Sequence, residues 1–412
     1  MAPLKRILIT SSYYWPEGAG TAPYVTGMAE YLSERGYDVA VSTTFPHYPS
    51  WARLPLLPLG RSERQAGVRL RRRWLYVPDH QSALQRAAYE GSMFAMGATA
   101  LPFRRPDVVL GFIPSVAAAS LGALAARAYR RPYGLIVHDL VGPGAQQSGM
   151  AGRRVSHTVS RVELAAARAA TGLGIIAEGF RRYFEEVGGI PAERIHRVRT
   201  WTRRAEPTLD RATARREMGW ADDQFICLHA GNMGRKQGLD NVLDAAQLLA
   251  GTNLRVVLLG DGNDRARLQK RAAALGLDQV TFEDFAGPGR YESLLAAADV
   301  LLVNQAPSVA DMSLPSKLTS YFASGEPVVA AIAPDSETAR EIGQAQAGVV
   351  VPPGDARALA DALVAVRDDP ARGAAVGERG LRFAREQLAP EKVLETYERF
   401  ALRVHADGAR GV

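Results

Sequence analysis

Short apolar runs alternate with longer amphipathic stretches along almost the whole chain. In its first half, runs rich in Val, Ile and Leu predict buried strands at Arg6–Ser11, Val39–Thr44, Asp107–Gly111, Tyr133–His138, Gly172–Ala177 and Ile195–Arg199. Stretches with apolar residues at helical spacing predict helices at Pro23–Arg35, Ser115–Tyr129 and Ser156–Ala170. A repeated strand–helix order is typical of a parallel sheet that is covered on both faces.

The same rhythm restarts after Thr200–Gln224, a polar stretch without a long apolar stripe. The strands predicted there are Phe225–Gly231, Leu254–Gly260, Val280–Phe282, Val300–Asn304, Pro327–Ile332 and Gly348–Val351. The predicted helices are Leu239–Ala250, Asp264–Leu275, Tyr291–Ala298, Ser316–Ser324, Glu337–Ile342, Ala356–Val366 and a helical stretch at Ala371–His405.

This pattern predicts an α/β protein with two tandem Rossmann-like, doubly wound domains and a cleft between them. We expect the N-terminal domain at 1–200, a linker at 201–224 and the C-terminal domain at 225–385. Residues 386–412 are expected to form a helix that packs back on the N-terminal domain.

Composition narrows the class of protein. The 412 residues are 47% hydrophobic and 23% charged, which excludes a disordered chain and suffices for several buried cores. No apolar run approaches the roughly 18 residues of a membrane-spanning helix, and Met1–Thr10 holds no cleavable export signal. The single cysteine, Cys227, excludes an internal disulfide and a thiolate metal site. We therefore expect a cytoplasmic protein.

Charge is distributed unequally. The chain carries 27 Lys and Arg against 14 Asp and Glu up to Ala205, and 23 against 29 in the remainder. Arginines alternate with Leu70 and aromatic residues in Arg69–Tyr76, which predicts a strand with one basic face. An anionic membrane surface is a suitable partner, at the inner face of the membrane, and a merely solvated face is the alternative. Nucleic acid is not expected, because no nucleic-acid-binding motif accompanies the patch.

Two Gly-rich connections follow predicted strands. The first contains Gly18, Ala19, Gly20 and Thr21; the second contains Gly231, Asn232, Gly234, Arg235 and Lys236. Glycine lets the backbone approach a ligand, and unpaired N–H groups with the helix dipole attract an anion. We expect an anion or acceptor contact at the first connection and a diphosphate at the second. A plain turn and a solvated basic turn are the respective alternatives.

A third candidate segment consists of Asp311, Ser313, Leu314, Pro315, Ser316 and Lys317. Ser316 is a suitable N-cap for the helix that follows, Lys317 would add positive charge at its start, and Asp311 could accept bonds from sugar hydroxyls. An ordinary capped helix is the alternative. A fourth candidate, His138-Asp139, ends an apolar strand where a cleft residue would emerge; an interior histidine is the alternative.

Other classes of site are disfavoured by what the sequence lacks. It has no Gly-x-x-x-x-Gly-Lys-Ser/Thr loop, no Gly-x-Ser-x-Gly elbow and no His-x-x-x-His pair. A P-loop nucleotidase, an α/β-hydrolase and a histidine-built metal site are therefore not expected.

Several motifs together resemble the family 4 glycosyltransferases of the GT-B fold. These motifs are Tyr13–Pro23, Phe45–Pro49, Gly231–Asp240 and Leu314–Leu318. They are most similar to the WcaI-type branch, bacterial transferases of colanic acid and related exopolysaccharide assembly. The resemblance covers nearly the whole chain.

This resemblance implies a retaining transferase that needs no metal or other cofactor. A sugar would move from a UDP-, GDP- or dTDP-linked donor, bound by the second domain, to an acceptor hydroxyl held by the first. The resemblance also assigns residue roles: Arg235 and Lys236 to the diphosphate, Gly260 and Asp261 to the nucleotide cleft, Phe285 to the base, and His138 and Asp139 to the transferred sugar.

The chain departs from the family pattern at three positions. Ser320 stands where many members carry a ribose-binding glutamate, and Gln237 stands where the broader family has a lysine. His138 stands where the branch often has glutamine. We interpret these differences as variation that bears on the choice of donor and acceptor.

The leading hypothesis is transfer to a polyprenyl-diphosphate-linked saccharide at the membrane. Transfer to a soluble natural product is an alternative with the same chemistry. Two further alternatives are a nucleotide-sugar epimerase and a non-catalytic sugar-nucleotide-binding protein. The sequence leaves open the donor base and sugar, the acceptor and linkage, and the oligomeric state.

Overall fold

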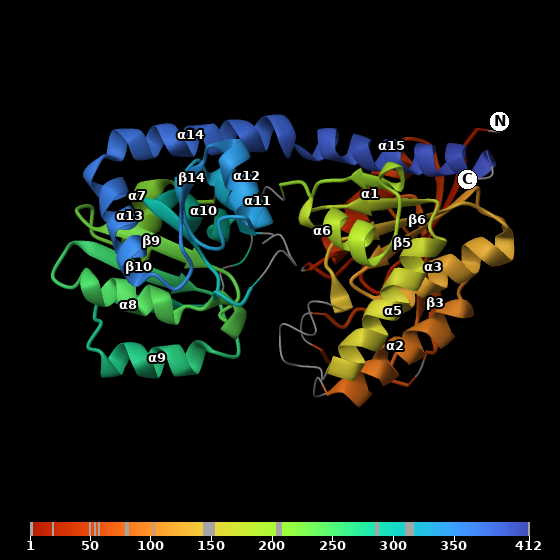
Figure 1. The fold of residues 1–412 in the computed structure, drawn as a ribbon, viewed down its shortest axis with the longest axis horizontal. Helices are drawn as coiled ribbons and strands as arrows, with labels where there is room; N and C mark the ends of the chain where they lie inside the picture. Colours follow the sequence, from red (N-terminus) through yellow and green to blue (C-terminus); the bar gives the residue numbers. More distant parts are fainter. Residues whose placement is uncertain are drawn as a thin grey trace. The chain divides into compact units, whose positions relative to one another are not determined.

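The computed structural model describes residues 3–18, 20–48, 51–52, 55–56, 58–78, 82–101, 104–142, 153–202, 208–284, 287, 289–309 and 317–410. The chain forms two compact units (Figure 1). One consists of Met1–Thr200 with Glu391–Val412, and the other of Trp201–Pro390. Both are parallel-rich α/β sheets, which confirms the predicted fold class.

The first unit contains an eight-stranded sheet in the order β3-β4-β2-β1-β5-β6-β7-β8. Its strands are β1 (Arg6–Thr10), β2 (Asp38–Thr44), β3 (Gly60–Gln65), β4 (Val68–Arg73), β5 (Val108–Ile113), β6 (Tyr133–Val137), β7 (Gly172–Ile175) and β8 (Ile195–Arg197). Its α-helices are α1 (Ala22–Glu34), α2 (Ala83–Ala98), α3 (Val116–Tyr129), α5 (Arg153–Ala169), α6 (Gly179–Arg182) and α15 (Pro390–Ala409). Only the β3–β4 pair is antiparallel among the described pairs.

The helix α15 belongs to this first unit although it ends the chain. Its Phe400 and Val404 pack onto β6 and β7, where Gly134 and Gly172 leave room for them. Tyr31 and Tyr37 donate hydrogen bonds to the carboxylate of Glu398 on α15, at 3.2 and 2.9 Å. Apolar packing and polar contacts thus both hold the C-terminal helix on the N-terminal sheet.

Besides the four-residue helix α6, two elements of the first unit are absent from the sequence prediction. They are β3, a polar edge strand, and α2, whose Ser82 side chain accepts a hydrogen bond from the Gln85 amide at the helix start. β3 lacks the apolar alternation that marks a half-buried strand. α2 packs on α3 through a small core cluster that includes Tyr89, Met93 and Leu121.

The predicted basic strand differs from expectation at one residue. Arg72 lies on the buried face of β4 with Val68 and Leu70. Its Nε donates to the Glu63 carboxylate at 2.6 Å, and its Nη1 donates to the Thr44 carbonyl oxygen at 3.2 Å. An arginine can be buried in this way because its guanidinium is paired and hydrogen-bonded. Arg72 is therefore not part of the solvent-exposed basic face that the sequence predicted for this strand.

The second unit contains a six-stranded parallel sheet in the order β11-β10-β9-β12-β13-β14. The strands are β9 (Phe225–Ala230), β10 (Leu254–Leu259), β11 (Val280–Glu283), β12 (Val300–Asn304), β13 (Val328–Ala331) and β14 (Gly348–Val351). The α-helices are α7 (Arg211–Glu217), α8 (Asp240–Leu248), α9 (Arg265–Ala274), α10 (Arg290–Ala297), α11 (Lys317–Ser324), α12 (Glu337–Ala345), α13 (Ala356–Asp368) and α14 (Pro370–Gln387).

Side chains alternate between two cores in this unit. Ile226 and Leu228 of β9 face a cluster built with α10, α11, α12 and α14, whereas Cys227 faces a cluster built with α8, α9 and α13. Successive residues of a strand point to opposite faces, so a strand buried on both faces reads as a continuous apolar run. This is why the sequence marked these strands clearly.

The stretch expected to be a linker contains ordered structure. Asp210 is the N-cap of α7, and its carboxylate accepts a hydrogen bond from the Thr213 amide at 2.9 Å. Ala214 and Trp220 are buried in the core of the second unit. The short helix supplies only a few apolar residues, too few to produce the long stripe by which a helix is recognised.

Candidate functional site

The connection after β9 lies where the strand order of the second sheet reverses. β9 is flanked by β10 on one side and by β12 on the other. The carboxyl ends of parallel strands at such a reversal are the usual ligand-binding edge of an open α/β sheet. The predicted donor residues Gly231, Asn232, Gly234, Arg235 and Lys236 all belong to this connection.

Backbone contacts fix the connection against its neighbours. Three amides donate across it: Gly231 N to Leu259 O at 2.8 Å, Met233 N to Asp261 O at 2.8 Å, and Ala306 N to Lys236 O at 2.9 Å. A Cβ at Gly260, which has φ of 129°, would lie 2.1 Å from the Gly231 oxygen, and one at Gly262 would lie 2.4 Å from the Met233 oxygen. The predicted Gly260-Asp261 segment therefore lies directly beside the Gly231 loop.

Gln237 and Asn304 brace the same loop from inside. Gln237 Oε1 accepts the Gly234 amide at 3.0 Å. Asn304, buried at the end of β12, donates from Nδ2 to the carbonyl oxygens of Gln237 and Gly238 at 2.7 and 2.9 Å. A lysine has no acceptor, so it could not make the contact that Gln237 makes. The departure from the family at this position is thus accommodated by the loop.

Lys317, the first residue of α11, lies beneath this loop. A Cβ on Gly231 would be 3.3 Å from the lysine Cε and Nζ, and Nζ lies 3.3 Å from Nε2 of the buried His229. Burial lowers the pKa of Lys317 to about 7. The pKa of His229 is also lowered, first by burial and then by the Lys317 charge. An anion on the loop would favour the charged ammonium, as expected of a diphosphate-binding lysine.

Arg235 and Lys236 occupy the short η3 helix (Arg235–Gln237) and are exposed. Among the residues that the structure describes, neither side chain makes an ion pair or a hydrogen bond. Ser320 is half-buried one turn after Lys317 on α11. Two exposed cations and one desolvated lysine therefore lie on or under a single loop. Asp261 is exposed beside it, and its carboxylate accepts the Gly262 amide at 2.8 Å.

Seven of the predicted site residues fall outside the described part of the chain. They are Ala19, Phe285, Asp311, Ser313, Leu314, Pro315 and Ser316. Their predicted roles remain predictions.

In the first unit, a buried glutamate joins the loops after β1 and β2. Glu17 Oε1 accepts the backbone amides of His47 and Tyr48 at 2.8 and 2.9 Å. Burial raises the pKa of Glu17, and these backbone donors oppose that rise. The Tyr48 ring lies against Gly20, with a contact of 3.1 Å to the position of a Cβ there. Glu17 and Gly20 therefore contact the Phe45–Tyr48 segment, to which the resemblance had linked this part of the chain.

An aromatic cluster adjoins this loop, and the sequence analysis missed part of it. Tyr89 of α2 hydrogen-bonds His47 Nε2 at 2.9 Å and donates to the Tyr13 hydroxyl at 3.3 Å. The Arg86 guanidinium stacks over the rings of Tyr89 and Trp51, 4.7 and 5.6 Å from their centroids. Burial lowers the pKa of His47 to about 4. Arg86 also pairs with the Glu90 carboxylate at 3.3 Å. Aromatic side chains of this kind suit stacking against a sugar ring.

His138 lies in the interior of the first unit. Its Nε2 is 3.4 Å from the Tyr397 hydroxyl of α15, and its ring packs on Tyr24 and Phe112. Burial lowers its pKa to about 3, so the imidazole stays neutral. These surroundings match the interior-histidine alternative. Asp139 is half-buried, and its charge, after burial, contributes to the raised pKa of Tyr48.

Glu163 of α5 supports the segment that follows Asp139. Its carboxylate accepts the Val141 amide at 2.8 Å, the Gly142 amide at 3.4 Å and the Tyr183 hydroxyl at 3.3 Å. Burial raises its pKa to about 7, and the three donors oppose the rise. The sequence offered no signal for this residue beyond one acid on an amphipathic helix.

Glu163→Gln is expected to change how stability depends on pH. Because the folded pKa of Glu163 is raised above its ordinary value of 4.5, this group destabilises the fold progressively as pH rises from about 4.5 to about 7. Glutamine keeps an acceptor without the charge. Relative to wild type, the variant should therefore gain on the order of 1–3 kcal/mol between pH 5 and pH 8 in urea unfolding. Glu186→Gln, at an exposed glutamate, is the control, and equal changes in both variants would contradict the assignment.

Among the described side chains, no three or more His, Cys, Asp or Glu residues are grouped to hold a metal ion. Within the same described ranges, no helix combines the length and the apolar character needed to span a bilayer.

Comparison with known families agrees with this two-unit arrangement. The family model described as "Glycosyl transferase 4-like domain" matches residues 19–201, and "Glycosyl transferases group 1" matches residues 210–383. The chain belongs to the family 4 glycosyltransferases of the GT-B type.

Particular relatives make the family more specific. The chain is 30% identical over 333 residues to the putative colanic acid biosynthesis glycosyl transferase WcaI of Escherichia coli K12, covering 78% of this chain and 81% of the relative. Its fold is similar to that of sucrose-phosphate synthase from Thermosynechococcus elongatus, with TM-score 0.76, 19% identity and coverage of 98% and 99%. It is also similar to Anabaena Alr3699/HepE in complex with UDP-glucose, with TM-score 0.69, 18% identity and coverage of 96% and 99%.

Proposed function

We propose that this protein transfers a sugar from a nucleoside-diphosphate donor to a hydroxyl of a lipid-linked saccharide in exopolysaccharide assembly, with retention of configuration. The observation that carries the proposal is the placement of Lys317 under the Gly231 loop, with Arg235 and Lys236 exposed on it. The colanic acid relative supports the acceptor class, and the UDP-glucose complex of a structural neighbour supports the donor class.

In this proposal the cations act on the leaving group. The bond between the anomeric carbon and the diphosphate oxygen breaks while the acceptor hydroxyl attacks from the same face, and the hydroxyl proton passes to the leaving diphosphate. Charge develops on the diphosphate, so Lys317, Arg235 and Lys236 would stabilise the transition state more than the ground state. No metal is proposed, because three side-chain cations and the loop amides supply the positive field.

The first unit would bind the acceptor. Its aromatic cluster would present Tyr48 and Trp51 to a sugar, with Arg86 over the Trp51 ring and paired with Glu90 at 3.3 Å. Tyr13, His47 and Tyr89 form the hydrogen-bonded base of this cluster. Peripheral attachment to the inner face of the membrane is part of the proposal, since a lipid-linked acceptor stays there.

Thermal shifts with UDP, GDP, dTDP and ADP test the donor site on wild type and on Lys236→Ala. One nucleotide should stabilise wild type saturably, since a ligand that binds only the folded state raises its stability by mass action. The same nucleotide should stabilise Lys236→Ala less. If no nucleotide stabilises the wild-type protein, the donor-site proposal is wrong. Turnover of the identified donor with a lipid-free acceptor alone would instead favour a soluble substrate.

A further inference from the structure

Three leucines of the first unit are unusually exposed. Leu84, at the start of α2, is 81% exposed, and Leu56 and Leu59, just before β3, are 72% and 52% exposed. Single exposed leucines are common on protein surfaces, but exposed apolar groups that gather on one surface mark an interaction site. Leu59 lines a cavity together with Met96 and Thr99 at the far end of α2, so Leu59 and Leu84 lie at opposite ends of that helix.

The outward face of α2 between them carries no charge. Leu84, Ala88, Gly91 and Ala95 follow helical spacing and are exposed. The charged residues of the helix point elsewhere: Arg86 stacks on Tyr89, and Glu90 accepts the Ser115 hydroxyl and the Ala117 amide at 2.9 Å each. An ordinary surface helix shows the reverse arrangement, with its charges towards water. The exposed face of α2 therefore lacks the charged side chains that a surface helix normally presents to water.

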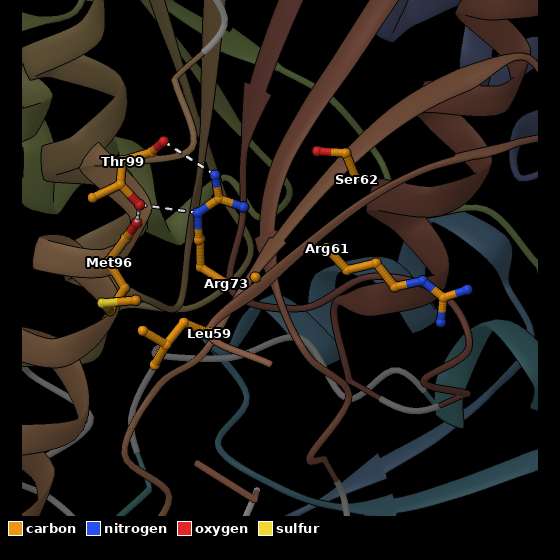
Figure 2. A pocket seen from close by; sticks show the side chains of 7 residues that line it. Leu59, Arg61, Ser62, Arg73, Met96 and Thr99 are labelled. Atoms are coloured by element: carbon orange, nitrogen blue, oxygen red, sulfur yellow. Dashed lines mark hydrogen bonds between the residues drawn. The ribbon is translucent and has the colours of Figure 1, made fainter. Parts of the chain in front are cut away.

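Arginines flank the apolar residues at the β3 end. The cavity of about 500 Å³ is lined by Leu59, Gly60, Arg61, Ser62, Arg73, Met96 and Thr99 (Figure 2). Arg73 extends across it to Thr99, donating to Oγ1 at 2.9 Å and to the carbonyl oxygen at 3.2 Å, and pairs with no carboxylate among the described residues. The Arg61 side chain is 67% exposed and extends away from Arg73.

The charge around this cavity is strongly positive. β3 and β4 carry six arginines and one acid, Glu63, which contacts both Arg61 and Arg72. Arg69 pairs with Asp38 of β2 at 2.7 Å, whereas Arg64 and Arg73 form no ion pair with a carboxylate among the described residues. Arg64 is exposed next to them. Burial, and after it the charge of the neighbouring Arg71, lower the pKa of Arg73. An anionic partner is therefore favoured here over a neutral or basic one.

We propose that Leu56, Leu59 and Leu84 insert into an anionic phospholipid leaflet while Arg61, Arg64 and Arg73 bind its headgroup phosphates. Exposed leucines bordered by arginines fit the layered chemistry of a bilayer surface, with apolar groups below the phosphates and cations at their level. The proposal deepens the proposed function and rests on it for the lipid-linked acceptor, because docking here would bring the first unit to the membrane where that acceptor resides.

Vesicle co-sedimentation of the full chain tests this surface without donor or acceptor. Vesicles of phosphatidylcholine alone are compared with vesicles that contain phosphatidylglycerol, at low and at physiological salt. Wild type should bind the anionic vesicles at least tenfold more tightly. Leu59→Asp and Leu84→Asp should each weaken binding about tenfold, and Arg61→Ser combined with Arg64→Ser should weaken it about twentyfold and flatten the salt dependence.

Matched controls separate this surface from general effects. Leu402→Asp, at a half-exposed leucine of α15, and Arg182→Ser, at an exposed arginine of α6, should bind vesicles as wild type does. Failure of wild type to bind anionic vesicles would overturn the proposal, and so would equal losses in the control variants. If the leucine variants change a dimer to a monomer in sedimentation velocity, the surface is an interface between two copies and not a lipid site.

Nucleotide binding, measured on the same variants without vesicles, keeps the two proposals distinct. Thermal shifts with the donor nucleotide should be unchanged by the leucine and arginine substitutions. If the wild-type protein does not bind anionic vesicles but is stabilised by the donor nucleotide, only the docking-surface proposal is overturned. If the wild-type protein binds anionic vesicles but no nucleotide stabilises it, only the proposed function is overturned.

Discussion

Replacing Lys317 by methionine is expected to weaken binding of the donor nucleotide by about 10- to 100-fold, since a hydrogen bond to a charged group contributes about 1.5–3 kcal/mol. Methionine keeps most of the apolar length of lysine and removes only the ammonium, so the packing under Gly231 should survive. The expected loss of kcat/KM is larger than the loss of nucleotide affinity, because the ammonium faces charge that develops on the leaving diphosphate. Isothermal titration and steady-state kinetics measure the two quantities.

The pH dependence of binding provides a second readout for Lys317. With its pKa lowered to about 7, the free lysine loses its proton as pH rises, whereas a bound diphosphate favours the protonated form. Nucleotide affinity should therefore be highest below pH 7 and should fall by up to about tenfold per pH unit above it. Lys317→Met should lack this fall between pH 7 and pH 9.

A matched substitution controls for the loss of a lysine from the second unit. Lys270→Met removes an exposed lysine from α9 and should leave both affinity and its pH dependence unchanged. Wild-type affinity in Lys317→Met would exclude the lysine from the diphosphate site.

Gly262→Ala is expected to damage both stability and donor binding. The added Cβ would meet the Met233 carbonyl oxygen at 2.4 Å and its carbonyl carbon at 2.5 Å, and backbone cannot move aside as a flexible side chain can. Met233 donates to Asp261 and accepts from Asp264, so relieving the clash would break the contacts that join the two loops. We expect about 1–3 kcal/mol of destabilisation in urea unfolding, as for overpacked cores.

Donor binding in Gly262→Ala should fall further than the loss of stability alone explains. At temperatures where the variant is fully folded, its nucleotide affinity should still be reduced, because the Gly231 loop is displaced. Gly343→Ala is the control: this glycine lies in α12 with open space around it, so alanine should be neutral or slightly stabilising. Wild-type affinity in folded Gly262→Ala would show that the close approach of the loops has no role in the donor site.

The alternation of buried strands and amphipathic helices was readable from the chain because the central strands of both sheets are buried on both faces. The strand β9, with its almost continuous apolar run, is an example. Among the helices, α12 was predicted with its start correct and its end within one turn of the observed end. α2 and β3 were missed for the opposite reason. The outward face of α2 is apolar and β3 is polar throughout, so neither shows the periodicity that burial against water imposes.

Local sequence patterns by themselves predicted the two units, the Gly-rich loop after β9 and the family, since all three depend on residues close together in the sequence. Tertiary structure decided which distant groups meet: Lys317 with His229 and Gly231, Glu17 with the Tyr48 loop, and Glu163 with the segment after Asp139. It also decided that His138 and Arg72 are interior, because burial follows from what packs against a side chain and not from its type. Desolvation by those neighbours, in turn, shifts the pKa values on which the proposed chemistry depends.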